Sequence, residues 1–97
     1  MTITRQYLDE KREAILEISR RHGAHDVRLF GSVARGDNIE VSDVDILVRF
    51  EPGRSLFDHV GLIADLEELL GVKVDVVSEG GMRERFRMHV LSEAVPL

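Results

Sequence analysis

The stretch from residue 27 to 50 constrains this chain more than any other part of the sequence. It begins and ends with short apolar runs that predict two strands, joined by a polar loop. The second run is entered through an acidic pair, Asp43-x-Asp45. Because alternate side chains of a strand share a face, we expect the two carboxylates on one side of a sheet, about 7 Å apart along the chain.

Two carboxylates held close together require neutralisation. Two unit charges about 4 Å apart repel by roughly 4 kcal/mol at an effective dielectric constant near 20, so a metal ion or a proton is expected between them. Oxygen ligands that leave room for water and substrate phosphates suit Mg²⁺. Taken alone, the pair also fits a loop-capping Asp43 beside a solvated Asp45, so the metal interpretation needs support from elsewhere in the chain.

The end of the first apolar run provides such support. Gly31 permits a tight turn directly after a strand, and Ser32 offers a hydroxyl and a backbone N–H group. The residues up to Arg35 predict a helical turn whose amides attract phosphate, with the Arg35 charge beside it. An ordinary strand-to-loop turn with a surface arginine is the alternative.

A third acid interrupts a later run of β-branched residues, 72–77, which predicts a third strand. A charge at Asp75, within an apolar alternation, needs a partner. The partner is either a cation, such as Lys73 or a nearby arginine, or a metal ion shared with the first two acids.

Gly31-Ser32 followed after ten residues by Asp43-x-Asp45 resembles the motif of the minimal nucleotidyltransferases of the DNA polymerase β superfamily. The resemblance covers nearly the whole chain and implies metal-dependent transfer of a nucleotidyl group from a nucleoside triphosphate such as ATP. It also implies that Asp43, Asp45 and a third carboxylate at Asp75 hold two Mg²⁺ ions, while Gly31 and Ser32 contact the triphosphate.

The resemblance further implies a partner protein. Some members of this family are antitoxins that pair with a helical HEPN ribonuclease toxin and transfer AMP onto a tyrosine of it. Two alternatives stay open: a binding module with a vestigial nucleotide site, and transfer to a small molecule such as an aminoglycoside.

Composition bounds these expectations. Ninety-seven residues with 43% hydrophobic and 32% charged side chains predict one soluble domain, residues 1–97. No apolar run could span a bilayer and no signal peptide is visible, so we expect a cytoplasmic protein without membrane contact. The chain has no cysteine, which excludes disulfides and thiolate metal sites. The net charge of −5 tells against binding of extended nucleic acid.

The predicted fold is α+β with α/β-type layering: the nucleotidyltransferase fold, a small mixed β-sheet flanked by helices in the order α-β-α-β-α-β-α. The near-continuous apolar run after Asp43 predicts a strand covered on both faces. The expected elements are a helix over 4–22, strands over 26–30 and 44–51, a helix over 55–70, a strand over 72–77 and a helix over 82–93.

Several details accompany this prediction. Ser55-x-x-Asp58 resembles a capping box and Gly71 a helix terminator. The loop over 36–42 is expected to be mobile until nucleotide and metal arrive, and Gly80-Gly81 to be a flexible joint. His25 is expected in a turn. The helix over 55–70 is expected to bury one side, formed by Leu56, Val60, Ile63, Leu66, the stem of Glu67 and Leu70.

Overall fold

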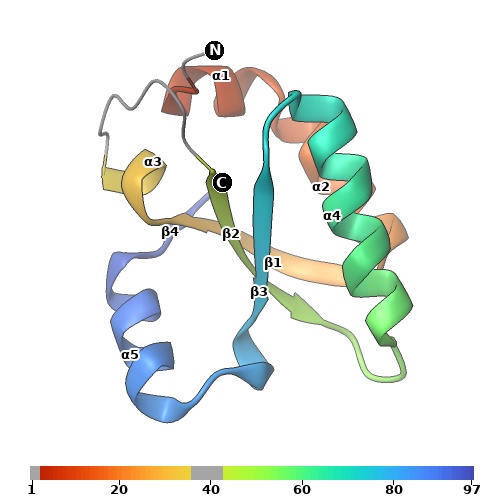
Figure 1. Ribbon diagram of the computed structural model, residues 1–97, viewed down its shortest axis with the longest axis vertical. Helices are drawn as coiled ribbons and strands as arrows, with labels where there is room; N and C mark the ends of the chain where they lie inside the picture. The colour runs from red at the N-terminus through yellow and green to blue at the C-terminus, as the bar shows by residue number, and fades with distance from the viewer. Residues whose placement is uncertain (1–2, 36–42) are drawn as a thin grey trace.

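The computed structural model describes residues 3–35 and 43–97 and shows a mixed sheet with helices on both sides (Figure 1). The strand order is β3-β2-β1-β4. β1 is antiparallel to β2 and β4, whereas β2 and β3 are parallel. This arrangement confirms the predicted α+β fold. The strands are β1 (Ala24–Phe30), β2 (Val44–Phe50), β3 (Val74–Ser78) and β4 (Val95–Pro96).

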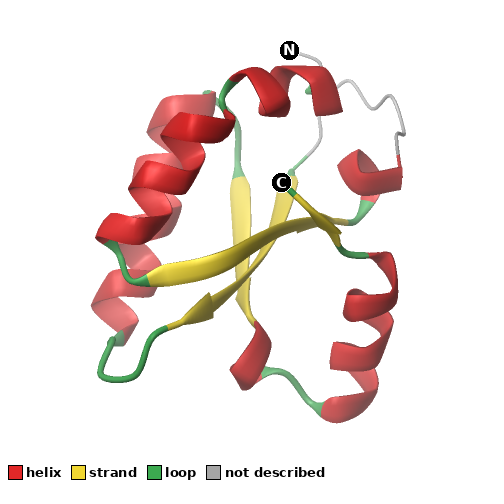
Figure 2. Cartoon of the chain, turned by 180° about the vertical axis from the view of Figure 1, so that it is seen from behind, coloured by secondary structure: helices red, strands yellow, loops and turns green. Residues whose placement is uncertain are grey.

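The helices form two groups on either side of the sheet. α2 and α4 pack against each other, α2 against β1 and α4 against β3, while α3 and α5 lie on the other side of the molecule (Figures 1 and 2). No helix among the described residues is long and apolar enough to cross a membrane. The helices are α1 (Arg5–Glu10), α2 (Arg12–Arg21), α3 (Ser32–Arg35), α4 (Leu56–Leu70) and α5 (Glu84–Glu93), with a 3₁₀ turn η1 (Glu79–Gly81) after β3.

The first predicted helix is divided in two, so the single helix expected over 4–22 was wrong. The break lies at Lys11, whose backbone leaves the helical region (φ −96°, ψ 5°). Thr4 caps the first segment by accepting a hydrogen bond from the Tyr7 amide at 3.1 Å. Leu8 of α1 and Ile15 of α2 are both fully buried in one core. The break at Lys11 changes the direction of the chain, so that both segments can pack against this core.

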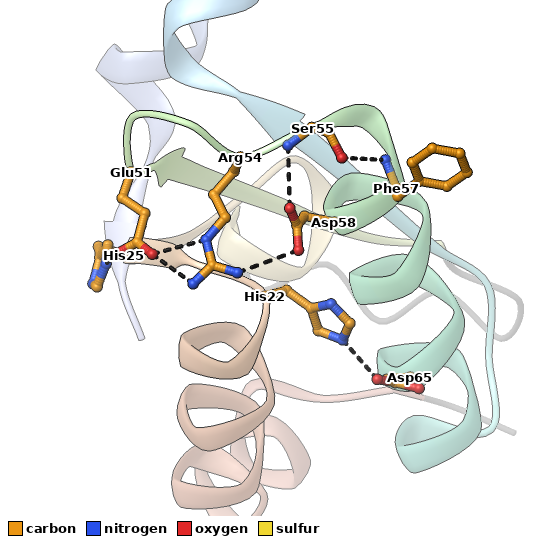
Figure 3. Close-up of polar contacts among 8 residues, drawn as sticks. All are labelled: His22, His25, Glu51, Arg54, Ser55, Phe57, Asp58 and Asp65. Atoms are coloured by element: carbon orange, nitrogen blue, oxygen red, sulfur yellow. Dashed lines mark hydrogen bonds and ion pairs between the residues drawn. The ribbon is translucent and has the colours of Figure 1, made fainter.

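The bounds of α4 were predicted correctly. Ser55 and Asp58 form the expected capping box, and Gly71 ends the helix in the left-handed conformation. A polar network fixes the loop before the helix (Figure 3): Glu51 accepts hydrogen bonds from Arg54, and His25 pairs with it at 3.0 Å. These contacts hold the loop in place at the start of α4.

The predicted buried side of α4 was partly wrong. Leu66 and Leu70 are buried as expected, together with Leu62, which was not predicted. Leu56 and Val60 are 75% and 58% exposed. The helix is apolar on more than one side, so its sequence pattern does not single out the side that faces the sheet.

Both faces of β2 are covered at its centre, as predicted. Ile46 and Leu47 are neighbours that point to opposite faces, and both are fully buried. Ile46 belongs to the main core with α2 and α4, whereas Leu47 lies outside that cluster, as does the buried Val90 of α5. We call the sheet face that bears Leu47 the open face. Asp45 and Arg49 lie on the same face, because side chains two residues apart in a strand point the same way.

Other boundaries shift by two or three residues. β1 begins at Ala24, so His25 lies in this strand, paired with Arg49, and the expected turn was wrong. Gly80 and Gly81 form part of η1, and the flexibility expected of them stays a prediction. β4 was not predicted. The expected mobility of the loop over 36–42 concerns residues outside the described part of the chain.

Candidate active site

The parallel register of β2 and β3 places two of the predicted acids side by side. Asp45 is the direct partner of Asp75 in this ladder, and paired residues of neighbouring strands project to the same face, with strands about 4.8 Å apart. Asp43 lies two residues before Asp45, where strand alternation returns to that face. The structure therefore gathers the three predicted carboxylates at the entry of two adjacent strands.

The negative charges of Asp43 and Asp75 act on the protonation of Asp45. The pKa of Asp45 is raised to about 6, first by burial and then by the negative charges of Asp75 and Asp43. The positive charge of Arg35 acts in the opposite direction and lowers it. Asp45 is thus the half-buried member of the group, close enough to the other two acids and to Arg35 for all three to affect its protonation.

The predicted turn lies directly against these acids. Gly31 has a positive φ of 75°, and a Cβ built on it would lie 2.3 Å from Oδ2 of Asp45. Any other residue at this position would be strained in its backbone and would have to displace the Asp45 carboxylate. Ser32 begins the single-turn helix α3, whose last amide, that of Arg35, donates to the Gly31 carbonyl at 3.1 Å.

Asp75 has no cationic partner in the part of the chain that the structure describes. The Asp75 side chain is exposed. In the described part of the chain it forms no ion pair or hydrogen bond with Lys73 or with an arginine. The salt-bridge interpretation left open by the sequence is therefore not supported. The Asp75 carboxylate is available to a ligand.

The donor set fits Mg²⁺ by its chemistry. Within residues 3–35 and 43–97, no three carboxylate or imidazole groups are close enough to enclose a metal ion as they stand. Asp43, Asp45 and Asp75 nevertheless supply hard oxygen donors on one face. A divalent cation would relieve the repulsion from Asp75 and Asp43, which adds to the effect of burial in raising the Asp45 pKa.

Sequence reasoning missed one residue of this region, Glu93 of α5. Its carboxylate accepts from Nη1 of Arg35 at 3.3 Å and lies 4.0 Å from His89. No sequence signal links the two partners, which are 58 positions apart. Glu93 fixes the end of α5 against α3, beside the acids.

Comparison with known proteins agrees with this geometry. The family profile described as nucleotidyltransferase domain matches residues 11–96. The protein adenylyltransferase MntA of Thermococcus cleftensis is 42% identical over 81% of this chain and 80% of its own length. A Methanocaldococcus jannaschii protein, provisionally named a protein adenylyltransferase, is 41% identical over 91% of this chain and 95% of its own.

Solved structures share the fold. A chain provisionally described as a minimal nucleotidyltransferase superposes with a TM-score of 0.88 at 55% identity, covering 98% of this chain and 97% of that one. A toxin-antitoxin crystal structure with AMP-PNP has a TM-score of 0.76 at 22% identity, over 87% of this chain and 69% of that one. The second likeness concerns the fold alone.

Proposed function

This chain belongs to the nucleotidyltransferase domain family, and we propose that it is a magnesium-dependent protein adenylyltransferase that acts as an antitoxin. In this proposal it transfers AMP from ATP to a tyrosine of a HEPN-type toxin. The observation that supports it best is the pairing of Asp45 with Asp75 on one sheet face, against a glycine that leaves room for the carboxylate.

The two curated relatives favour a protein acceptor, because both are named protein adenylyltransferases. One of them carries the name MntA, and solved complexes of an MntA with a toxin share this fold. A toxin partner is inferred from these names. Action in the cytoplasm, where ATP is available, is part of the same proposal.

The proposed reaction joins the tyrosine oxygen to the α-phosphorus of ATP and breaks the bond to pyrophosphate. When bound, Mg²⁺ would be held by Asp43, Asp45 and Asp75 and would neutralise charge on the phosphates. The exposed Asp75 carboxylate takes the proton of the attacking hydroxyl. Pyrophosphate leaves with the electrons of the broken bond.

The remaining residues bind and orient the nucleotide. Gly31 has no side chain, so its backbone can approach a phosphate closely, and Ser32 follows it at the start of α3. Arg35 supplies a positive charge next to the acids and is held by Glu93. Catalysis then rests on positioning and on charge neutralisation, as is general for phosphoryl transfer.

Nucleotide binding tests the metal part of this proposal. Calorimetry with ATP should show binding in Mg²⁺ and at least tenfold weaker binding in EDTA, because the acids alone repel a triphosphate. Equal affinity in the two buffers would contradict the assignment of Asp43 and Asp45 as metal ligands.

A transfer assay separates the enzyme from a purely binding antitoxin. The chain is mixed with its toxin partner and ATP labelled at the α-phosphate, and label on the toxin is followed beside the toxin's ribonuclease activity. We expect Asp43→Asn to abolish both labelling and neutralisation. A variant that still neutralises the toxin without labelling it would show that binding alone suffices.

A further inference from the structure

The open face carries a second cluster of charged groups, at the end away from the acids. Arg49 lies four residues after Asp45 on β2, so it shares that face at about 13 Å along the strand. Glu79, at the end of β3, is largely buried and accepts from Arg28 at 3.1 Å. Arg49 and Arg87 also approach it, at 3.4 and 3.7 Å. Arg49 also pairs with Asp26 at 3.5 Å, so three guanidinium groups stand against two carboxylates in this cluster.

A cavity of about 440 Å³ opens beside this cluster. It lies between the end of β2, the turn η1 and the first turn of α5. Its lining residues are Arg49, Glu79, Gly80, Met82, Glu84 and Arg87. A carboxylate side chain entering it would meet the guanidinium groups of Arg49 and Arg87, which Glu79 attracts to the edge of the cavity.

The outer surface of α5 extends the cationic region. Arg83 and Arg85 are exposed and make no ion pair within residues 3–35 and 43–97. Phe86 and Met88, which follow them along α5, are 50% and 64% exposed. Arginine, methionine and aromatic residues are the types enriched at protein–protein interfaces. This combination is distinctive in a chain whose net charge is −5.

α5 connects this surface with the acids. Its first turn lies at the cavity, and its last residue, Glu93, holds Arg35. Ten residues of helix span about 15 Å, which matches the distance along the strands from Asp45 to Arg49. A protein seated on α5 therefore lies within one helix length of the reacting groups.

We propose that the outer surface of α5 and the adjoining cavity are where the acceptor protein docks, through an acidic segment. The proposal rests on the proposed function, because the acceptor is the substrate of that reaction. A polynucleotide fits less well than a short acidic segment, because its continuous phosphate backbone would extend past the arginines to Glu84 and to the three acids at the strand entry.

The experiment uses a defined acidic probe that carries tyrosine. Fluorescein-labelled poly(Glu,Tyr) copolymer is titrated with the chain at low salt without nucleotide, and binding is followed by anisotropy. Arg83→Glu/Arg85→Glu should raise the Kd at least tenfold. Its melting temperature and its ATP-induced thermal shift should stay at the wild-type values, since neither arginine has an ion-pair partner among the described residues or belongs to the proposed nucleotide site.

Matched variants on the other side of the sheet provide the controls. Arg20→Glu/Arg21→Glu makes the same change in net charge at exposed positions of α2 and should leave the Kd within twofold of wild type. Phe86→Ala should weaken binding, whereas Phe57→Ala should not, although Phe57 is 89% exposed at the start of α4.

Several results would overturn the docking surface. These are an unchanged Kd for Arg83→Glu/Arg85→Glu, an equal loss in the α2 control, a larger loss in Phe57→Ala than in Phe86→Ala, and tighter binding of labelled oligo(U) than of the copolymer. A failure of the proposed function looks different. If no AMP is transferred by the wild-type chain while the anisotropy pattern holds, adenylyl transfer is refuted and the surface for acidic polypeptides stands.

Discussion

Gly31 and Asp45 occupy adjoining space: a single carbon atom added to Gly31 would lie 2.3 Å from Oδ2 of Asp45. Gly31 directly follows β1 and Asp45 is the second residue of β2, so the contact joins the two halves of the motif. The carboxylate keeps its place because the neighbouring residue has no side chain.

Gly31→Ala should therefore damage the site more than the fold. The backbone at φ 75° costs alanine about 1–2 kcal/mol, and the added methyl group must displace Asp45. We expect AMP transfer to fall at least tenfold. Gly71→Ala is the matched control, because Gly71 has nearly the same φ, 74°, and nothing within 4 Å. Similar melting temperatures with activity lost only in Gly31→Ala would support this reading, and equal activities would contradict it.

The raised pKa of Asp45 makes the stability of the metal-free chain depend on pH. An acid with a pKa of about 6 when folded and about 3.8 when unfolded binds protons more tightly in the folded state. Its unfavourable contribution is therefore absent below about pH 4, grows as the pH rises to 6, and is fully present above.

Asp45→Asn should remove this cost. In EDTA at pH 7.5 we expect a gain of about 1 kcal/mol, after discounting for partial exposure, which is about 4–8 °C in melting temperature. At pH 4 the gain should vanish. Glu68→Gln, at an exposed acid of α4, should change neither melt. A variant no more stable than wild type at pH 7.5 would show that the three acids do not strain the fold.

Asp75→Asn should separate nucleotide binding from chemistry. Asp75 has no structural partner among the described residues, so the melting temperature should not fall. Binding of ATP with Mg²⁺ should persist through Asp43 and Asp45. Transfer of AMP should drop about 100-fold or more if the carboxylate accepts the proton of the hydroxyl. Wild-type transfer rates in a stable Asp75→Asn chain would remove it from the site.

Two leucines of α4 test which side of the helix supports the core. Leu66 is fully buried, so Leu66→Ala should lower the free energy of unfolding by about 2–5 kcal/mol. Leu56 is 75% exposed, so Leu56→Ala should change it by less than about 0.5 kcal/mol. Urea denaturation measures both. A large loss for Leu56→Ala would restore the burial that the sequence pattern suggested.

The sequence by itself determined the features that depend on neighbouring residues. The β2 segment shows as an apolar run, the start of α4 as a capping box and its end as Gly71, and the structure has all three where they were expected. The turn after β1 and the acidic pair were also visible, because strand alternation and the conformational freedom of glycine act over a few residues.

Only the tertiary structure decided which distant residues meet. The register that sets Asp75 against Asp45 depends on how α4 carries the chain back to a parallel strand, and the ion pair of Arg35 with Glu93 depends on where α5 comes to lie. β4 is two residues long and includes a proline, so its pairing with β1 exists only because the core brings them together. Such contacts are selected by packing of the whole chain, since no local preference distinguishes one partner from another.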